Sequence, residues 1–143
     1  MTRHPSALNC LFASCLVVAS SACSVTYADM PLTIARDAFG GEAQFVGHLQ
    51  MSGGCIVALR ADGVPSTVLF DPDIRLTSDV RGVFDPRTGR SIRFGTPVTG
   101  SAAKLRSEGN GWAVADIEEF FGVRIPANCP RDAVMRLHDL IEQ

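Results

Sequence analysis

The chain contains the stretch Gly53-Gly54-Cys55-Ile56-Val57-Ala58-Leu59, in which a glycine pair precedes a cysteine and an unbroken apolar run. A short apolar run between turn residues is typical of a buried strand. The run is followed by Ala61-Asp62-Gly63, and an Asp-Gly pair favours a tight hairpin turn. Ser66–Phe70 then supplies the return strand, so we expect a β-hairpin over residues 55–70.

The N-terminus has the pattern of an export signal. Arg3 and His4 form a basic start, and the run from Leu8 to Ala19 is apolar, uncharged and too short to span a bilayer. Small residues follow at Ser20-Ser21-Ala22. We therefore expect residues 1–28 to be a leader, and the chain to be exported to the periplasm or the outer membrane, or secreted.

Two positions compete as the end of this leader. Thr26 and Ala28 supply the small side chains that a signal peptidase reads, which favours cleavage after Ala28. Ser20-Ser21-Ala22-Cys23 resembles a bacterial lipoprotein box, although the family pattern prefers an aliphatic residue where Ser20 stands. If Cys23 is lipidated, its acyl chains tether the protein to a membrane without a spanning helix.

The remaining cysteines indicate a disulfide. Cys10 and Cys15 leave with the leader and Cys23 is removed or lipidated, so Cys55 and Cys129 remain as thiols in an oxidising compartment. We expect them to be bonded; the alternative is two separately buried thiols. No metal site is expected, because two cysteines without nearby ligand partners cannot complete a tetrahedral shell.

The mature chain has the size and charge of one small acidic domain. Residues 29–42 are mixed in composition and are interpreted as an arm or linker, and 43–143 as a single domain. Loss of Arg3 changes the net charge from −2 to −3. Without a basic block, this charge offers no case for nucleic acid binding.

Short segments fenced by turn residues follow one another along this domain. This spacing is typical of a small barrel or sandwich. A polar, glycine-broken stretch at 101–111 is expected to be a loop, and 115–121 a short helix stopped by Gly122. The last stretch fits either a helix or a final strand. The expected strands are 43–51, 55–60, 66–70, 80–84, 91–94 and 95–100.

These features together resemble small uncharacterised secreted and lipoprotein domains of bacteria. The resemblance spans Phe45 to Ile141 and rests on the Gly54-Cys55 strand, the Asp-Gly hairpin, the Phe-Asp-Pro strand exit, the Asp-Pro-x-x-Gly turn, Phe94–Gly100 and Ile125–Cys129. It implies a five-stranded barrel of the oligonucleotide/oligosaccharide-binding (OB) shape with one disulfide, and it favours a strand at the C-terminus. It carries over no catalytic residues and no cofactor.

The residues offer little for catalysis. After the leader only His48 and His138 remain, and no G-x-S-x-G motif occurs. The pair His138-Asp139 could serve a nearby serine. Carboxylates for hydrolysis are found at Glu118-Glu119 and at Asp71 with Asp73. Adjacent helical residues do not face each other, so the glutamates suit a solvated surface better, and Asp71-Pro72-Asp73 lacks the glycine and distal glutamate of a calcium loop.

We therefore expect a non-enzymatic binding or structural module of the envelope, whose partner is an envelope protein or other ligand. The alternatives are a small carboxylate-dependent hydrolase and a secreted enzyme inhibitor. Small barrels often bind polymers through aromatic and arginine side chains. Arginine is equally common as a solvated charge at a strand edge. The candidate face comprises Arg75, Arg81, Phe84, Arg87, Arg90, Arg93 and Phe94.

Overall fold

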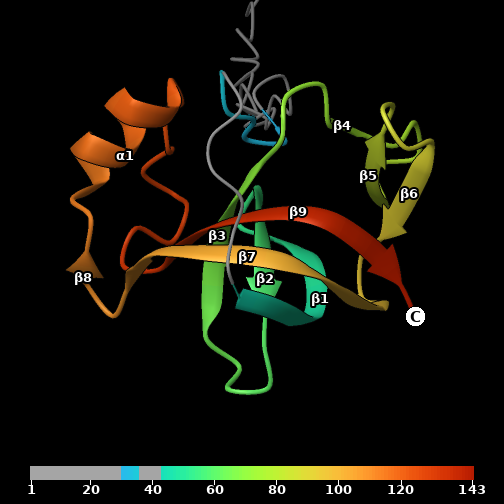
Figure 1. Cartoon of the computed structure of the whole chain (residues 1–143), viewed down its shortest axis with the longest axis horizontal. Coiled ribbons are helices and arrows are strands. Elements are labelled where there is room, and N and C mark those ends of the chain that lie inside the picture. Colours follow the sequence, from blue (N-terminus) through green and yellow to red (C-terminus); the bar gives the residue numbers. More distant parts are fainter. Residues whose placement is uncertain (1–29, 36–42) are drawn as a thin grey trace, which may run out of the picture.

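The computed structural model describes residues 30–35 and 43–143, whose arrangement is shown in Figure 1. The predicted leader and its candidate lipidation residue Cys23 lie outside the described residues, as does most of the predicted arm. The elements are β1 (Ala43–Ser52), β2 (Cys55–Leu59), β3 (Pro65–Phe70), β4 (Arg75–Leu76), β5 (Gly82–Asp85), β6 (Arg90–Arg93), β7 (Pro97–Ser107), β8 (Asn110–Gly111), α1 (Val114–Phe121) and β9 (Val134–Glu142).

The larger sheet has the strand order β1-β2-β3-β9-β7-β8. β1 also pairs with β7, so that β1, β2, β3, β9 and β7 close into a ring with β8 at its edge. Neighbouring strands of the ring are antiparallel except β3 and β9, which run parallel. The protein is therefore mainly β with one short helix among the described residues, as the sequence predicts.

β1 closes the ring by changing partners along its length. Its residues 43–48 pair with β7, and its residues 48–52 pair with β2. Gly47 lies at this change, where a Cβ would collide with the carbonyl oxygen of Leu59. Gly47 is therefore needed for the close approach of two backbones.

The sheet is buried on both faces where β2, β3 and β9 meet. Ile56, Val68 and Met135 belong to the core inside the ring. Val57 and Leu69 alternate with them and belong to a second core on the outer face. Strands covered on both faces read as continuous apolar runs, which explains why Cys55–Leu59 shows no polar alternation.

The outer core is covered by three segments that lie far apart in the sequence. Leu32 and Ile34 come from residues 30–35, Ile117 and Phe121 from α1, and Ile125 from the segment that follows α1. Backbone hydrogen bonds hold residues 30–35 in place, including Ile34 N–H to the Phe70 carbonyl at 3.0 Å and Ala35 N–H to the Phe121 carbonyl at 2.8 Å.

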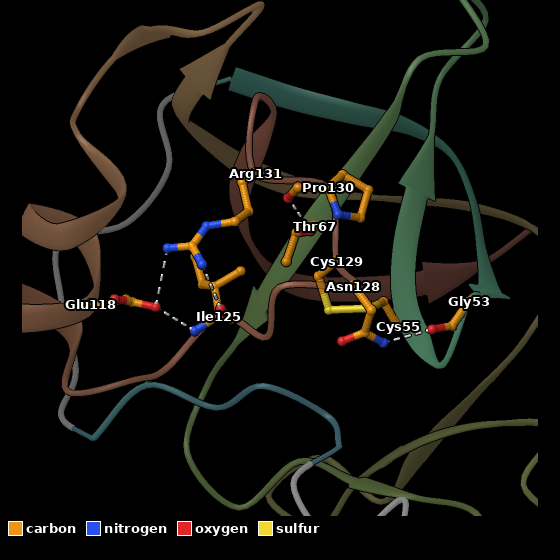
Figure 2. The surroundings of a disulfide bond; sticks show 9 residues. All are labelled: Gly53, Cys55, Thr67, Glu118, Ile125, Asn128, Cys129, Pro130 and Arg131. Carbon is orange, nitrogen blue, oxygen red and sulfur yellow. Dashed lines mark hydrogen bonds and ion pairs between the residues drawn. A yellow bond between two sulfur atoms is a disulfide. The ribbon is translucent and has the colours of Figure 1, made fainter. Parts of the chain in front are cut away.

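The disulfide between Cys55 and Cys129 ties this cover to the ring. Both cysteines are buried in the outer core, and the bond joins the start of β2 to the segment before β9. Figure 2 shows two further ties beside it: Asn128 Nδ2 donates to the Gly53 carbonyl at 2.7 Å, and Thr67 Oγ1 donates to the Pro130 carbonyl at 2.6 Å. The predicted bond is therefore confirmed.

The strands β4, β5 and β6 form a separate small sheet in that order. This hairpin sheet follows β3 in the chain and lies on the opposite side of the ring from α1 and β8 (Figure 1). Its Val83 and Ile92 belong to the core inside the ring, together with Phe70 and Leu137 from β3 and β9. The hairpin sheet thus covers the end of the ring where β3 and β9 end.

The structure corrects the expected loop at 101–111 and decides between helix and strand at the C-terminus. The predicted loop at 101–111 is wrong for its first part, because β7 continues as a strand to Ser107. Pairing with both β1 and β9 overrides the polar composition, whose side chains are mostly partly exposed. The C-terminal stretch is the strand β9, and α1 ends at Gly122 in the left-handed conformation as expected. No helix among the described residues is long and apolar enough to cross a bilayer.

Candidate functional site

The hairpin sheet has two faces of different character. Val83 of β5 lies opposite Ile92 of β6 and Leu76 of β4, and these three apolar side chains face the ring. Because successive strand residues point to opposite faces, Phe84 must point away from the ring. The outward face therefore carries the row formed by Arg75, Phe84 and Ser91, with Arg93 beside it.

Arg75 stacks on Phe84 across the outward face. Its guanidinium carbon lies 5.0 Å from the centre of the Phe84 ring, within the range of a cation–π contact. Arg75 is exposed and forms no ion pair with a carboxylate of the described residues. The two side chains border a shallow groove of about 480 Å³, which is also lined by Leu76, Thr77, Ser78 and Ser91.

The other residues of the predicted face do not join this row. Arg90 lies opposite Asp85 on the face toward the ring. Arg87, in the turn between β5 and β6, reaches Asp71 at 3.3 Å. Phe94 is partly buried against the inner core. Arg81 is exposed in the turn before β5. The structure thus brings together Arg75, Phe84 and Arg93 and separates them from the rest.

Glu142 fastens the hairpin sheet to the last residues of β9. Its Oε1 accepts hydrogen bonds from the Arg93 backbone N–H at 2.6 Å and from Thr96 Oγ1 at 3.0 Å. The Arg93 N–H is the main cause that holds the pKa of Glu142 below its ordinary value of 4.5, and the Thr96 hydroxyl and the Arg93 charge act in the same direction. Both the backbone N–H and the side chain of Arg93 therefore contact Glu142, the latter with Nε 3.5 Å from Oε1.

Glu142→Gln is expected to lower the free energy of unfolding by about 1 kcal/mol at neutral pH, because a charged acceptor is replaced by a neutral one. A carboxylate whose pKa is lowered by folding stabilises the protein above its unfolded pKa and loses this effect as the pH falls through the folded pKa. The difference between the two proteins should therefore shrink in acid. Urea unfolding at several pH values measures it; a difference that persists at the lowest pH would contradict this cause.

The candidate catalytic pair His138 and Asp139 is formed. His138 Nδ1 lies 2.8 Å from Asp139 Oδ2, and Asp139 adopts a left-handed conformation with φ of 53° beside an irregularity in the β7–β9 pairing. Ser101 is the cross-strand partner of His138. Asp139 Oδ1 also lies 3.8 Å from Arg87. His48 is half-buried on β1. Catalysis by these residues stays a prediction.

Two of the four candidate carboxylates, Glu118 and Asp71, take part in structural contacts. Glu118 Oε1 accepts from the Ile125 backbone N–H at 2.8 Å and lies 3.9 Å from Arg131 Nη2, so it joins α1 to the segment that carries Cys129 (Figure 2). The expected solvated surface therefore holds for its exposed neighbour Glu119 and is wrong for Glu118, which is partly buried. Asp73 is exposed in a left-handed conformation. In the described ranges no three His, Cys, Asp or Glu residues are placed to hold a metal ion.

Asp71 is the centre of a charged cluster between the ring and the hairpin sheet. Its Oδ1 accepts from Arg136 Nη2 at 2.7 Å, and its Oδ2 from Arg87 Nη2 at 3.3 Å. Asp85 also lies 3.8 Å from Arg87. Arg136 is only 4% exposed. Sequence inspection missed Arg136, because a single arginine in an apolar tail gives no signal of its buried partner.

Sequence inspection also missed an exposed aromatic cluster on the other side of the ring. Trp112 and Phe120 pack edge to face, with ring centres 5.2 Å apart, and remain 43% and 47% exposed. The predicted helix contained Phe120, but only the fold shows that Phe121 faces the outer core while Phe120 does not. Nothing in the described residues shows what would contact this cluster.

The chain was compared with models of known protein families, with curated proteins and with solved structures, and no match was found in any of the three. The interpretation of function therefore depends on the sequence and on the geometry described above.

Proposed function

We propose that this protein is an exported, non-enzymatic binding module built on an OB-like barrel, and that its ligand surface is the outward face of the hairpin sheet. The barrel is supported by the strand order of the ring, β1-β2-β3-β9-β7. The third and fifth ring strands along the chain, β3 and β9, pair in parallel. The basic, apolar and small-residue leader supports export. The disulfide is compatible with an oxidising compartment.

The hairpin sheet is favoured as the ligand surface because the outer face of β2 and β3 is already covered by other segments of the chain. OB folds bind their ligands on the face of strands two and three and on the adjoining loops. Here the outer face of β2 and β3 lies beneath residues 30–35, α1 and the segment of Cys129. A ligand at that face would have to displace a disulfide-anchored apolar core. The hairpin sheet carries instead an exposed outward face, and this difference favours it as the binding surface.

The observation that carries the proposal is the stacked pair Arg75 and Phe84. An exposed arginine over an aromatic ring, with no carboxylate partner among the described residues, presents its N–H donors to an incoming group. Ser91 adds a hydroxyl group along the same groove, whereas the Thr77 hydroxyl already donates to Asp79 Oδ1 at 2.6 Å. This combination suits an acidic segment of an envelope protein, with a carboxylate on Arg75 and apolar groups on Phe84.

Arg75→Gln is expected to weaken capture of such a partner about tenfold, the cost of one charge-assisted contact and its stacking. The measurement is quantitative pull-down from the native envelope, after which the captured protein is purified and titrated against each variant. Arg124→Gln is the matched control, because Arg124 is exposed, unpaired within the described residues and distant from the groove. Added salt should weaken binding of the wild type more than of the variant.

Equal affinity of the wild type and Arg75→Gln for the purified partner would contradict the proposed surface. Retained circular dichroism of each variant shows that it is folded. A photo-crosslinking residue at position 84 should give an adduct with the partner, whereas one at the exposed position 119 on α1 should not. Adducts at position 119 alone would place the interface on the other side of the ring.

A further inference from the structure

We propose that the protein has a second, separate site, which binds a phosphate group at the end of the ring away from the hairpin sheet. The site is formed by three cationic residues and two serines around one pocket: Arg60, Lys104, Arg106, Ser66 and Ser107. It does not depend on the ligand surface proposed above, with which it shares no residue.

The ring topology brings these residues together. Arg60 follows β2 at the turn into β3, Ser66 lies near the start of β3, and Lys104, Arg106 and Ser107 lie at the end of β7. β9 begins beside them, with Val134 paired to Arg106 and Met135 to Lys104. Figure 1 shows the end of β7 next to β8, across the ring from the hairpin sheet.

The pocket has the size of a small ion. Its volume is about 40 Å³, which corresponds to roughly three water-sized probes at about 10 to 15 Å³ each. A tetrahedral oxyanion fits such a space, whereas a sugar ring or a nucleobase does not. Ser66 is 8% exposed and forms part of the wall, so a hydroxyl group is available away from bulk solvent.

The charges around the pocket are not balanced by ion pairs. Arg60, Lys104 and Arg106 form no ion pair with a carboxylate in the described part of the chain, whereas Arg87, Arg93, Arg131 and Arg136 each do. Two acidic residues, Asp62 and Glu108, also line the pocket. Asp62 Oδ1 accepts from the Val64 backbone N–H at 3.0 Å and so belongs to the turn. Three cations against two carboxylates leave the pocket lining with a formal net charge of +1, which an anion would offset.

Arg106 adds an observation that points to a ligand. Its Nη1 donates to the Trp112 carbonyl at 2.9 Å, and Arg106 is among the residues that line the pocket. Its Nε is buried and donates to no acceptor among the described residues. A buried donor without an acceptor costs about 1 to 3 kcal/mol. A phosphate oxygen in the adjoining pocket would supply an acceptor.

The residue types favour phosphate over a carboxylate. Arginine binds planar and tetrahedral oxyanions through two N–H groups, and lysine acts as a point charge. Three cations and two hydroxyl donors around one pocket provide more donors than a carboxylate, with its two oxygens, can use. A phosphomonoester offers three terminal oxygens and nearly two charges at neutral pH.

Lys104 makes the site directly testable, because it is the only lysine in the chain. The full exported protein is acetylated with an amine-reactive ester, with inorganic phosphate or with sodium chloride at the same ionic strength. Mass spectrometry of the Lys104 peptide gives the rate. Phosphate well above its Kd is expected to slow acetylation about tenfold relative to chloride, since only the free site reacts. Equal rates in phosphate and chloride would overturn the proposal.

Two arginine variants distinguish binding of phosphate at this pocket from a nonspecific effect of the protein's charge. Arg60→Gln is expected to abolish most of the protection of Lys104 by phosphate, whereas Arg124→Gln, the same charge change at an exposed distant position, should preserve it. Loss of protection in both variants would overturn the specific site. Glycerol phosphate and vesicles containing phosphatidic acid then distinguish a soluble phosphomonoester from a lipid headgroup. Protection by either identifies the source of the same phosphate group.

Discussion

Replacing Cys55 and Cys129 together with alanine is expected to lower the free energy of unfolding by about 4 kcal/mol. The bond closes a loop between residues 74 positions apart, and the loop-entropy model assigns a cross-link of this span roughly 4 to 5 kcal/mol. A domain of this size has a total stability of about 5 to 15 kcal/mol. The change should therefore remove a large part of the stability. Urea unfolding of the oxidised protein and the variant measures it.

The structure gives a second reason for a large effect. The cover over β2 and β3 consists of short segments with little regular structure apart from α1, and among the described residues the Cys55–Cys129 bond is its one covalent cross-link to the ring. Without the bond, Asn128 and Thr67 still donate hydrogen bonds across this boundary. Each of these is worth only about 1 kcal/mol, so they cannot replace the covalent tie.

Two comparisons test this explanation. The wild type in a reductant should lose nearly as much stability as the double variant, since both retain the same neighbours. Asn128→Ala, which removes the hydrogen bond to Gly53 but keeps the disulfide, should lose only about 1 kcal/mol. If the reduced protein unfolds at the same urea concentration as the oxidised one, the bond contributes little and the cover is held by packing alone.

The elements with local signals were predictable from the sequence. The Asp62-Gly63 turn, the apolar run from Cys55 and the glycine at the end of α1 each act through their immediate neighbours. The structure places β2, β3 and α1 within a few residues of the expected bounds. The pairing of Cys55 with Cys129 was predictable by elimination, because the expected export and the count of cysteines left one partner.

The features that depend on distant partners could not be predicted. The stretch after Gly100 looks like a loop, yet it is a strand because β1 and β9 flank it on both sides. The arginines around Phe84 and Phe94 read as one cluster, but the turn at Arg87 and the alternation of β5 and β6 send them to different faces. The face to which each side chain of a strand points can be assigned from a sequence only when the bounds of the strand and its covered face are known.

The residues of the proposed phosphate pocket could not be grouped from the sequence either, because they are distant in the chain. Arg60 lies more than forty residues before Lys104 and Arg106, and the ring brings them to one pocket. The motif Phe-Asp-Pro occurs twice, at residues 70–72 and 84–86, and only the fold shows how the two copies are related. Asp71 and Asp85, the acids of the two copies, both lie within 3.8 Å of Arg87. What reads as two independent strand exits is thus one charged cluster.

Asp71→Ala is expected to lower the free energy of unfolding by about 3 kcal/mol, because it removes the carboxylate that faces a buried guanidinium. Asp71 and Arg136 are 9% and 4% exposed, and their contact of 2.7 Å joins the end of β3 to β9. Removing one partner of a buried ion pair costs about 3 to 5 kcal/mol. The lower figure applies here because Asp71 is at the edge of the core.

Arg87→Gln removes only the exposed contact of the Asp71 carboxylate and keeps its buried contact with Arg136. The Arg87 side chain is 61% exposed and lies 3.3 Å from Asp71, and exposed ion pairs contribute about 0 to 1 kcal/mol. Urea unfolding should therefore show a loss for Asp71→Ala that is at least about three times that for Arg87→Gln. Equal, small losses would mean that Arg136 keeps its charge satisfied through its other contacts, and that Asp71 serves mainly to position the turn of the hairpin sheet.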